Sequence, residues 1–174
     1  MKIEISKDGS RHQAGRKGGV TFRRPTSTDG ASVWSLIGDL DALDDNSMYC
    51  NFAETCVVAE LDGEVIGWVS AYLPPAKSGT LFVWQVAVAP EARGRGLAKA
   101  MLRDLLKRGA CDDVTHMEST ITKDNEASWA LFRSIAGEIE GDLNHNPHFR
   151  RDQHFDGEHA TEHLVRIGPI ERER

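Results

Sequence analysis

Hydrophobic and polar positions change their period several times along the chain, and each change marks a new element. A short β-rich run at 20–24 precedes a helical pattern that should end near Leu40. Two further β-rich runs, 55–61 and 64–72, flank Asp62 and Gly63, a dipeptide that favours a two-residue hairpin. We therefore expect these two runs to pair as antiparallel neighbours.

The second half of the chain alternates between strands and helices. The run 81–89 is nearly continuously apolar, as in a strand buried on both faces, and a helix of periodic leucines follows from Leu97. A second passage predicts a strand at 114–122, a helix at 125–137 capped by Gly137, and a last strand at 163–170. The order predicts an α/β (α+β) domain with a mixed, mostly antiparallel central sheet flanked by helices.

Composition favours a single domain. The chain has 174 residues, of which 40% are hydrophobic and 28% charged, and no apolar stretch approaches the roughly 20 residues of a membrane span. The N-terminus lacks the apolar core of a secretory signal, and Cys50, Cys56 and Cys111 show no paired spacing. We expect a cytoplasmic protein with reduced cysteines and one domain at 20–170, between a flexible basic leader (1–19) and a charged end (171–174).

Net charge argues against a general affinity for nucleic acid. The formal charge is -6, whereas phosphate backbones are bound by clustered excess Lys and Arg. Only the leader is basic, and it is interpreted as a solvated tail, with a nucleic-acid arm as the alternative.

A glycine-rich junction joins strand 81–89 to the following helix. The apolar run stops at Pro90, and Arg93-Gly94-Arg95-Gly96 leads into the helix start. The amides that begin a helix lack intrahelical acceptors and carry the positive end of its dipole, so two arginines and small residues here favour a pyrophosphate. Neither a Walker loop nor a dinucleotide fingerprint has this spacing. A turn that only reverses the chain is the alternative.

At this junction the sequence resembles the GCN5-related N-acetyltransferases (GNAT), over about residues 20–170. The residues that carry the resemblance are Arg-x-x-Gly-x-Ala after "VAVAP", and "NEASWALF" at 125–132. The resemblance implies that acetyl-CoA binds in a splay between strands 81–89 and 114–122, with its pantetheine arm along Val86 and Val88. It also implies that Asn125 contacts the pantetheine. The implied pyrophosphate site consists of Arg93, Gly94, Arg95, Gly96, Leu97 and Ala98.

Five stretches in the same order resemble one group within this family, which acetylates the γ-amino group of L-2,4-diaminobutyrate in ectoine biosynthesis, a response to osmotic stress. They are "LDDNSMY", "TLFVWQVAV", "EST", "NEAS" and "HATEHLVRIGPI". The resemblance implies the same small diamino acid as substrate, a homodimer, and His159 as a substrate contact. The alternatives are another diamine, diamino acid or protein amine as acceptor, or a CoA-binding regulatory domain without activity.

The chemistry also requires a group that accepts a proton, because only a neutral amine attacks a thioester. Glu118 is the best candidate, on the same strand face as His116 and Thr120. Burial beside apolar walls is expected to raise its pKa, which would suit a base. A solvated strand residue is the alternative for Glu118.

A diamino acid needs acidic and aromatic groups in its pocket. Asp44, Asn46 and Tyr49 on a polar loop supply that set, with Trp84 as a wall. Asp44 would pair with the α-ammonium; the alternatives are a helix cap for Asp44 and a core position for Trp84. Arg133 and Arg166 are both open as partners of the substrate carboxylate.

Three further features bear on the mechanism. Phe132 stands where the family often has a tyrosine that protonates the departing thiolate. Tyr49 or water would therefore have to be the proton donor. The Val86 amide is the candidate donor to the oxyanion. Five of the seven histidines lie between His145 and His163, but no helix is predicted to bring a pair together, so no metal site is expected.

Overall fold

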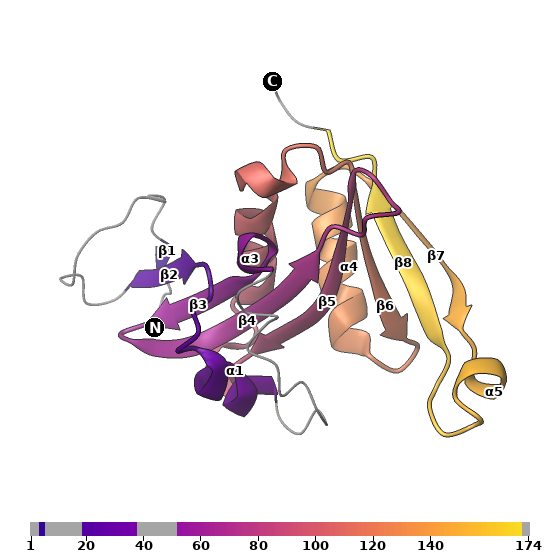
Figure 1. Ribbon diagram of the computed structural model, residues 1–174, viewed down its shortest axis with the longest axis horizontal. Coiled ribbons are helices and arrows are strands. Elements are labelled where there is room, and N and C mark those ends of the chain that lie inside the picture. Colours follow the sequence, from indigo (N-terminus) through magenta and orange to yellow (C-terminus); the bar gives the residue numbers. More distant parts are fainter. Residues whose placement is uncertain (1–3, 6–18, 38–51, 172–174) are drawn as a thin grey trace. The chain divides into compact units, whose positions relative to one another are not determined.

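A computed structural model describes residues 4–5, 19–37 and 52–171 of the chain (Figure 1). Two compact units are distinguished, the first formed by residues 1–71 and 85–110 and the second by residues 72–84 and 111–174. Strand β5 (Thr80–Val88) contributes residues to both. Each unit is described by itself.

In the first unit the strands follow the order β1-β2-β3-β4-β5. β1 (Glu4–Ile5) is parallel to β2 (Gly19–Arg23), whereas β3 (Val57–Leu61) is antiparallel to both β2 and β4 (Glu64–Tyr72). Leu61 pairs with Glu64, and Asp62 and Gly63 between them have positive φ angles of 51° and 87°. The predicted hairpin is confirmed, because this turn needs residues that tolerate positive φ.

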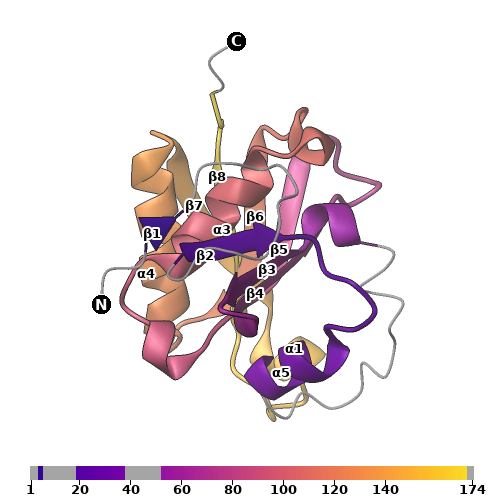
Figure 2. The same ribbon diagram turned by 90° about the vertical axis from the view of Figure 1, so that its left-hand side faces the viewer.

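Helices α1 (Gly30–Ile37) and α3 (Leu97–Leu106) cover opposite faces of this part of the sheet (Figure 2). Val33 of α1 packs in a buried cluster with Cys56, Val58 and Trp68. The neighbouring Gly67 points the other way, where a Cβ would come within 2.9 Å of the Met101 side chain of α3. Successive strand residues face opposite sides, so Trp68 and Gly67 identify the two faces. Short 3₁₀ helices lie at Ala53–Thr55, Pro90–Ala92 and Gly109–Cys111.

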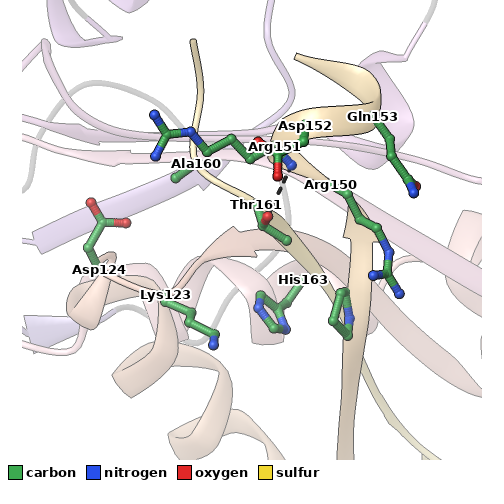
Figure 3. Close-up of a pocket in the computed structure, with 10 residues that line it drawn as sticks. Lys123, Asp124, Arg150, Arg151, Asp152, Gln153, Ala160, Thr161 and His163 are labelled. Atoms are coloured by element: carbon green, nitrogen blue, oxygen red, sulfur yellow. Dashed lines mark hydrogen bonds between the residues drawn. The ribbon is translucent and has the colours of Figure 1, made fainter. Parts of the chain in front are cut away.

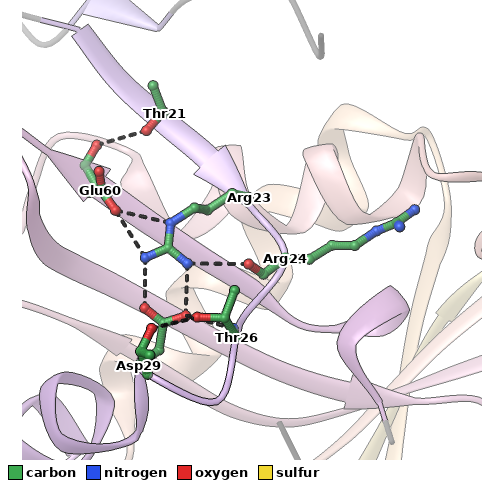
Figure 4. A network of polar contacts seen from close by, with 7 residues as sticks. Thr21, Arg23, Arg24, Thr26, Asp29 and Glu60 are labelled. Carbon is green, nitrogen blue, oxygen red and sulfur yellow. Dashed lines mark hydrogen bonds and ion pairs between the residues drawn. The ribbon is translucent and has the colours of Figure 1, made fainter. Parts of the chain in front are cut away.

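Arg23 joins β2 to the start of α1 through a polar network (Figure 4). Its guanidinium donates to both Asp29 carboxylate oxygens at 2.6 and 2.7 Å, and its Nε donates to Glu60 at 2.9 Å. The Thr26 amide and hydroxyl also donate to Asp29, at 2.6 and 2.9 Å. These hydrogen bonds, of which those from Arg23 have the largest effect, lower the pKa of Asp29 from 3.8 to about 2.

Replacing Asp29 by alanine should lower the free energy of unfolding by about 2 kcal/mol, because Arg23 and the Thr26 amide lose a charged acceptor. The depressed pKa adds a pH dependence: this stabilisation is complete above the ordinary pKa and is lost as pH falls from about 4 towards about 2. Urea unfolding at neutral and acid pH measures both effects. The exposed Asp142→Ala change is the control, and an equal loss in both variants would contradict the prediction.

The second unit has the strand order β5-β6-β8-β7, with β6 at His116–Thr122, β7 at Asp142–Phe149 and β8 at Glu162–Gly168. β5 and β6 are parallel, while β8 is antiparallel to both β6 and β7. Helix α4 (Glu126–Glu138) buries Trp129, Phe132, Ile135 and Ala136 and packs against β7 and β8; α5 (Arg151–His154) is a single turn. No helix in the described ranges is long and apolar enough to cross a membrane.

Two features of this unit differ from the sequence prediction. β7 was not expected, because it is an edge strand that contains Pro147 and is exposed along nearly all of its length, so it lacks an apolar alternation. Gly137 does not cap α4 but lies inside it. The residue with positive φ is Glu140 (53°), and the Gly141 amide donates to the Ala136 carbonyl at 3.0 Å to close the helix end.

Both cysteines of the described ranges are buried and form no disulfide with each other: Cys56 lies in the first unit and Cys111 in the second. Burial raises the pKa of Cys56 to about 11, so it is a neutral thiol at physiological pH. Cys50 lies outside the described residues.

Candidate functional site

Glu118 on β6 is a buried carboxylate held between two cations. Its side chain is only 1% exposed, yet Lys77 Nζ lies 2.7 Å from Oε2 and Arg166 Nη1 lies 2.5 Å from Oε1. Lys77 and Arg166 are themselves 46% and 43% exposed. The solvated alternative for Glu118 is therefore wrong, and each carboxylate oxygen has a cationic donor.

The sheet register brings these three residues together. Glu118 is paired with Arg166 on β8 and with Phe82 on β5, and paired side chains share a face. Lys77 lies in the turn before β5, which is anchored because the Gly79 carbonyl accepts hydrogen bonds from the Thr115 and His116 amides at 2.8 and 3.0 Å. Gly79 has a φ of 70°, a conformation that favours glycine. The turn thus places Lys77 beside the first residues of β6.

The ionisation of Glu118 differs from the sequence prediction. Burial raises its pKa, as expected, but the hydrogen bonds and charges of Lys77 and Arg166 together outweigh burial and leave the pKa below its ordinary value. Glu118 is therefore an anion at neutral pH while both cations contact it. To accept a proton from an amine it must first lose at least one of them.

The paired ladder of β5 and β6 ends beside Glu118. It begins with Thr80 beside His116 and stops with Phe82 beside Glu118, although β5 continues to Val88 and β6 to Thr122. Phe82 contacts the Tyr72 ring, with centroids 5.3 Å apart. Trp84 lies two residues further on the same strand face and is 46% exposed, so its core interpretation is wrong. An exposed indole remains available to a ligand at this end of the ladder.

The junction after β5 has the geometry of an open loop before a helix. The 3₁₀ turn Pro90–Ala92 leads to Arg93, whose Nε donates to the Val88 carbonyl at 3.0 Å. Gly94 and Gly96 have φ angles of 71° and 76°, and a Cβ on either would meet nothing within 4 Å. Residues 93–96 are exposed, and Gly96 is the N-cap of α3. The first amides of a helix lack intrahelical acceptors, so together with two arginines they can hold an anion here.

Asn125 and Arg133 both belong to α4. Asn125 is its N-cap, with Oδ1 accepting a hydrogen bond from the Ser128 amide at 3.0 Å, which leaves the amide NH₂ for another partner. The Arg133 guanidinium lies 5.5 Å from the Trp129 ring centroid, on the α4 side of the sheet. Arg133 is therefore separated from Glu118, which faces away from α4 with Arg166.

The remaining predicted residues fall into three groups. Asp44, Asn46 and Tyr49 lie outside the described residues. His159 is exposed, with its ring 5.5 Å from the Phe155 ring, in the loop before β8. The coenzyme positions Val86, Val88 and Ala98 are partly buried and Leu97 is 3% exposed, so Leu97 can contribute only its main chain.

Two further observations concern side chains outside the Glu118 cluster. Phe132 is 2% exposed and belongs to the buried face of α4, so it has a packing role. Among the described residues, no group of three or more His, Cys, Asp or Glu side chains is arranged to hold a metal ion.

Sequence reasoning missed Lys77. Its segment, "LPPAKSGT", only breaks the apolar pattern between two strands, and its contact with Glu118 spans 41 positions. Nothing in the local sequence marks this lysine. Only the parallel pairing of β5 with β6 could have indicated that the turn before one strand lies beside the other.

Comparison with known proteins gives a family and close relatives. The model of the family described as Acetyltransferase (GNAT) family matches residues 30–137. The chain is 44% identical over 157 residues to the L-2,4-diaminobutyric acid acetyltransferase of Methylotuvimicrobium alcaliphilum, covering 87% of this chain and 91% of that protein. It is 47% identical over 152 residues to the protein of the same name from Vibrio cholerae, covering 84% and 88%.

Solved structures confirm the expected α/β fold. The chain resembles diaminobutyrate acetyltransferase EctA from Paenibacillus lautus, in complex with L-2,4-diaminobutyric acid and coenzyme A, with a TM-score of 0.77 and 40% identity. The match covers 89% of this chain and 98% of that chain. A likeness to YncA from Salmonella typhimurium, with a TM-score of 0.65 and 17% identity, supports the fold alone.

Proposed function

Because the chain belongs to the acetyltransferase (GNAT) family, which matches residues 30–137, we propose that it transfers the acetyl group of acetyl-CoA to the γ-amino group of L-2,4-diaminobutyrate. The product would be N4-acetyl-diaminobutyrate, a step of ectoine biosynthesis. Relatives of that name align with most of this chain, and a structure 40% identical to it holds the same diamino acid and coenzyme A. Within this chain, the observation that carries the proposal is the buried Glu118 carboxylate between two displaceable cations.

The coenzyme is proposed to bind along the second half of β5 and the loop after it. The diphosphate would accept hydrogen bonds from the main chain of 94–98, where two glycines with positive φ keep the approach open. Arg93 and Arg95 add positive charge. The pantetheine would pair with Val86 and Val88, and the Asn125 NH₂ would meet it, because the cap bond uses only Oδ1.

Glu118 is proposed to bind the acceptor amine and then to take its proton, directly or through a water molecule. The substrate carries two ammonium groups, and an incoming ammonium can replace that of Lys77 on Oε2. The incoming ammonium supplies the charge that Lys77 gave, so the pKa of Glu118 rises towards the range useful to a base as Arg166 turns to the substrate carboxylate while burial remains. The neutral nitrogen attacks the thioester carbonyl, the C–N bond forms, and the C–S bond breaks.

Recognition of the rest of the substrate follows from the same charges. Arg166 is proposed as the partner of the α-carboxylate, since it is half-exposed beside Glu118, whereas Arg133 lies on the α4 side of the sheet. Trp84 would form a wall and His159 a rim contact. Asp44, with Asn46 and Tyr49, would hold the α-ammonium and leave the γ-amine for the thioester.

The oxyanion and the leaving thiolate need donors. The Val86 amide is proposed to donate to the oxyanion, a contribution of typically a few kcal/mol. Tyr49 is the proposed proton donor to the thiolate, with water as the alternative, because Phe132 has no proton to give.

Acetyl-CoA turnover by the purified protein tests the proposal, with diaminobutyrate, ornithine, lysine and putrescine as acceptors. We expect diaminobutyrate to give the highest kcat/KM and NMR of the product to show acetylation on the γ-nitrogen. Equal rates on all four amines would show that the enzyme accepts a broad range of amines and is not specific for diaminobutyrate. No turnover on any amine, with coenzyme A still bound, would favour a regulatory domain.

Replacing Lys77 by methionine should move the acid limb of the kcat/KM profile to higher pH. The Lys77 hydrogen bond lowers the pKa of Glu118 while burial raises it, so the pKa rises when the lysine is removed. The profile is measured with saturating acetyl-CoA, and the exposed Lys107→Met change at the end of α3 is the charge-matched control. If the acid limb stays in place, Lys77 does not set the ionisation of Glu118 in the working enzyme.

We further propose, on the strength of the resemblance, a homodimer that works in the cytoplasm. Light scattering of the purified protein across a concentration series tests the dimer. A single monomer mass at every concentration would reject it.

A further inference from the structure

A polar cavity lies within the second unit, among the β6–α4 turn, the end of β7, α5 and the start of β8 (Figure 3). Its volume is about 590 Å³, within the range of small-molecule sites. Lys123, Arg150 and Arg151 line it together with His163, and Asp124 and Asp152 are the acidic members. None of these residues has a role in the proposed acetyl transfer.

His163 supplies a buried polar atom that is not satisfied. The residue is 4% exposed, and its Nε2 has no hydrogen-bond partner among the described residues. Its Nδ1 lies 3.4 Å from Nδ1 of His145, and its ring packs against Trp129 with centroids 6.3 Å apart. Buried polar atoms almost always have partners, so an unpaired ring nitrogen beside a cavity indicates a missing ligand atom.

Positive charge gathers beside this nitrogen. Lys123 lies close enough to lower the pKa of His163, after burial itself, and Figure 3 shows the two side chains turned towards the same space. Neither Lys123 nor Arg150 forms an ion pair with another described residue. Arg151 is partly engaged, since its Nε donates to the Gly157 carbonyl at 2.9 Å.

The acidic residues do not cancel this charge. The Asp124 carboxylate accepts hydrogen bonds from Thr122 and from its own amide, which lower its pKa and keep it ionised at neutral pH. Asp124 and Asp152 together carry two negative charges against the three positive charges of one lysine and two arginines. The cavity is therefore net basic.

The cavity is separate from the Glu118 site. Successive residues of β8 face opposite sides, so His163 and Arg166, three positions apart, point to different faces of the sheet. Arg166 is paired with Glu118, whereas His163 is paired with Ile121 on the side covered by α4. A ligand in this cavity would not contact the Glu118 carboxylate.

We propose that this cavity binds an oxyanion, the phosphate or carboxylate group of a small molecule, through Lys123, Arg150 and the Nε2–H of His163. The exposed Lys123 side chain moves to admit the oxyanion to Nε2. Binding fixes the proton of His163 on Nε2, and the His145 Nδ1–H then donates to Nδ1 of His163. Two charged donors and one neutral donor would hold one oxyanion.

Titration of the full chain with inorganic phosphate and, separately, with acetate tests the proposal by NMR of ¹⁵N-labelled histidine. His163 is assigned as the imidazole signal that His163→Asn removes. We expect a saturable shift of that signal, and the tighter of the two anions identifies the source as phosphate or carboxylate. Lys123→Met should weaken binding by about tenfold or more. Lys107→Met, which removes the same charge at the end of α3, should not.

Two results would overturn the proposal. One is a shift of the His163 imidazole signal that never saturates with anion concentration, or a shift that Lys107→Met weakens as much as Lys123→Met does. Either behaviour would be explained by general ionic screening. The other is loss of the shift when coenzyme A competes for the anion, because the cavity would then belong to the coenzyme site. Both readouts are independent of acetyl transfer, so neither depends on the proposed function.

Discussion

Glu118→Gln should lower kcat for diaminobutyrate by about 10²- to 10⁴-fold, the usual contribution of a general base. Glutamine keeps the shape, and its one carbonyl oxygen can still accept a hydrogen bond from Lys77 or from Arg166. It takes no proton and carries no charge for an ammonium. The KM for diaminobutyrate should rise as well, whereas the KM for acetyl-CoA should change little. Steady-state kinetics at neutral pH measure all three constants.

The exposed Glu64→Gln change on β4 is the matched control, with the same chemistry at a surface site. Thermal unfolding separates catalysis from stability, because Glu118 is buried and its two cations lose their partner. If Glu118→Gln keeps wild-type kcat at neutral pH, Glu118 is not the base. If Glu118→Gln is inactive because it is unfolded, Glu118→Asp provides the test. Aspartate keeps the charge and should retain partial turnover.

Gly96→Val should raise the KM for acetyl-CoA by about tenfold or more, while kcat changes less. Gly96 has a φ of 76°, which costs a residue with a Cβ roughly 1–2 kcal/mol, and most for a β-branched one. The open space around Gly96 means that the strain lies in the backbone and not in a clash. To relieve it, the loop must turn its amides away from the diphosphate. Kinetics with varied acetyl-CoA and calorimetry with coenzyme A measure the effect.

Gly63→Val is the control for strain alone. Gly63 has a φ of 87° in the exposed β3–β4 hairpin, and a Cβ added there would also meet nothing within 4 Å. Both variants should lose stability by similar amounts, but only Gly96→Val should weaken coenzyme binding. Equal KM values in the two variants would show that the loop after β5 does not hold the coenzyme.

The fold was largely predictable because its signals are local. The Asp62 and Gly63 turn, the apolar β5 and the leucine face of α3 each depend on a few adjacent residues. The prediction failed at β7, where pairing with β8 and not an apolar pattern makes the strand. It also failed at the end of α4, where Glu140 adopts the positive φ that was expected of Gly137.

The sequence by itself determined the glycine loop after β5 that we propose to bind the diphosphate, because glycine tolerance of positive φ and helix-start amides are properties of a short segment. It also indicated Glu118, by its type and its strand. Only the tertiary structure decided the ionisation of Glu118, because its two cations come from 41 and 48 positions away. Charge interactions depend on distance in space, and burial alone would have given the opposite sign for the pKa shift.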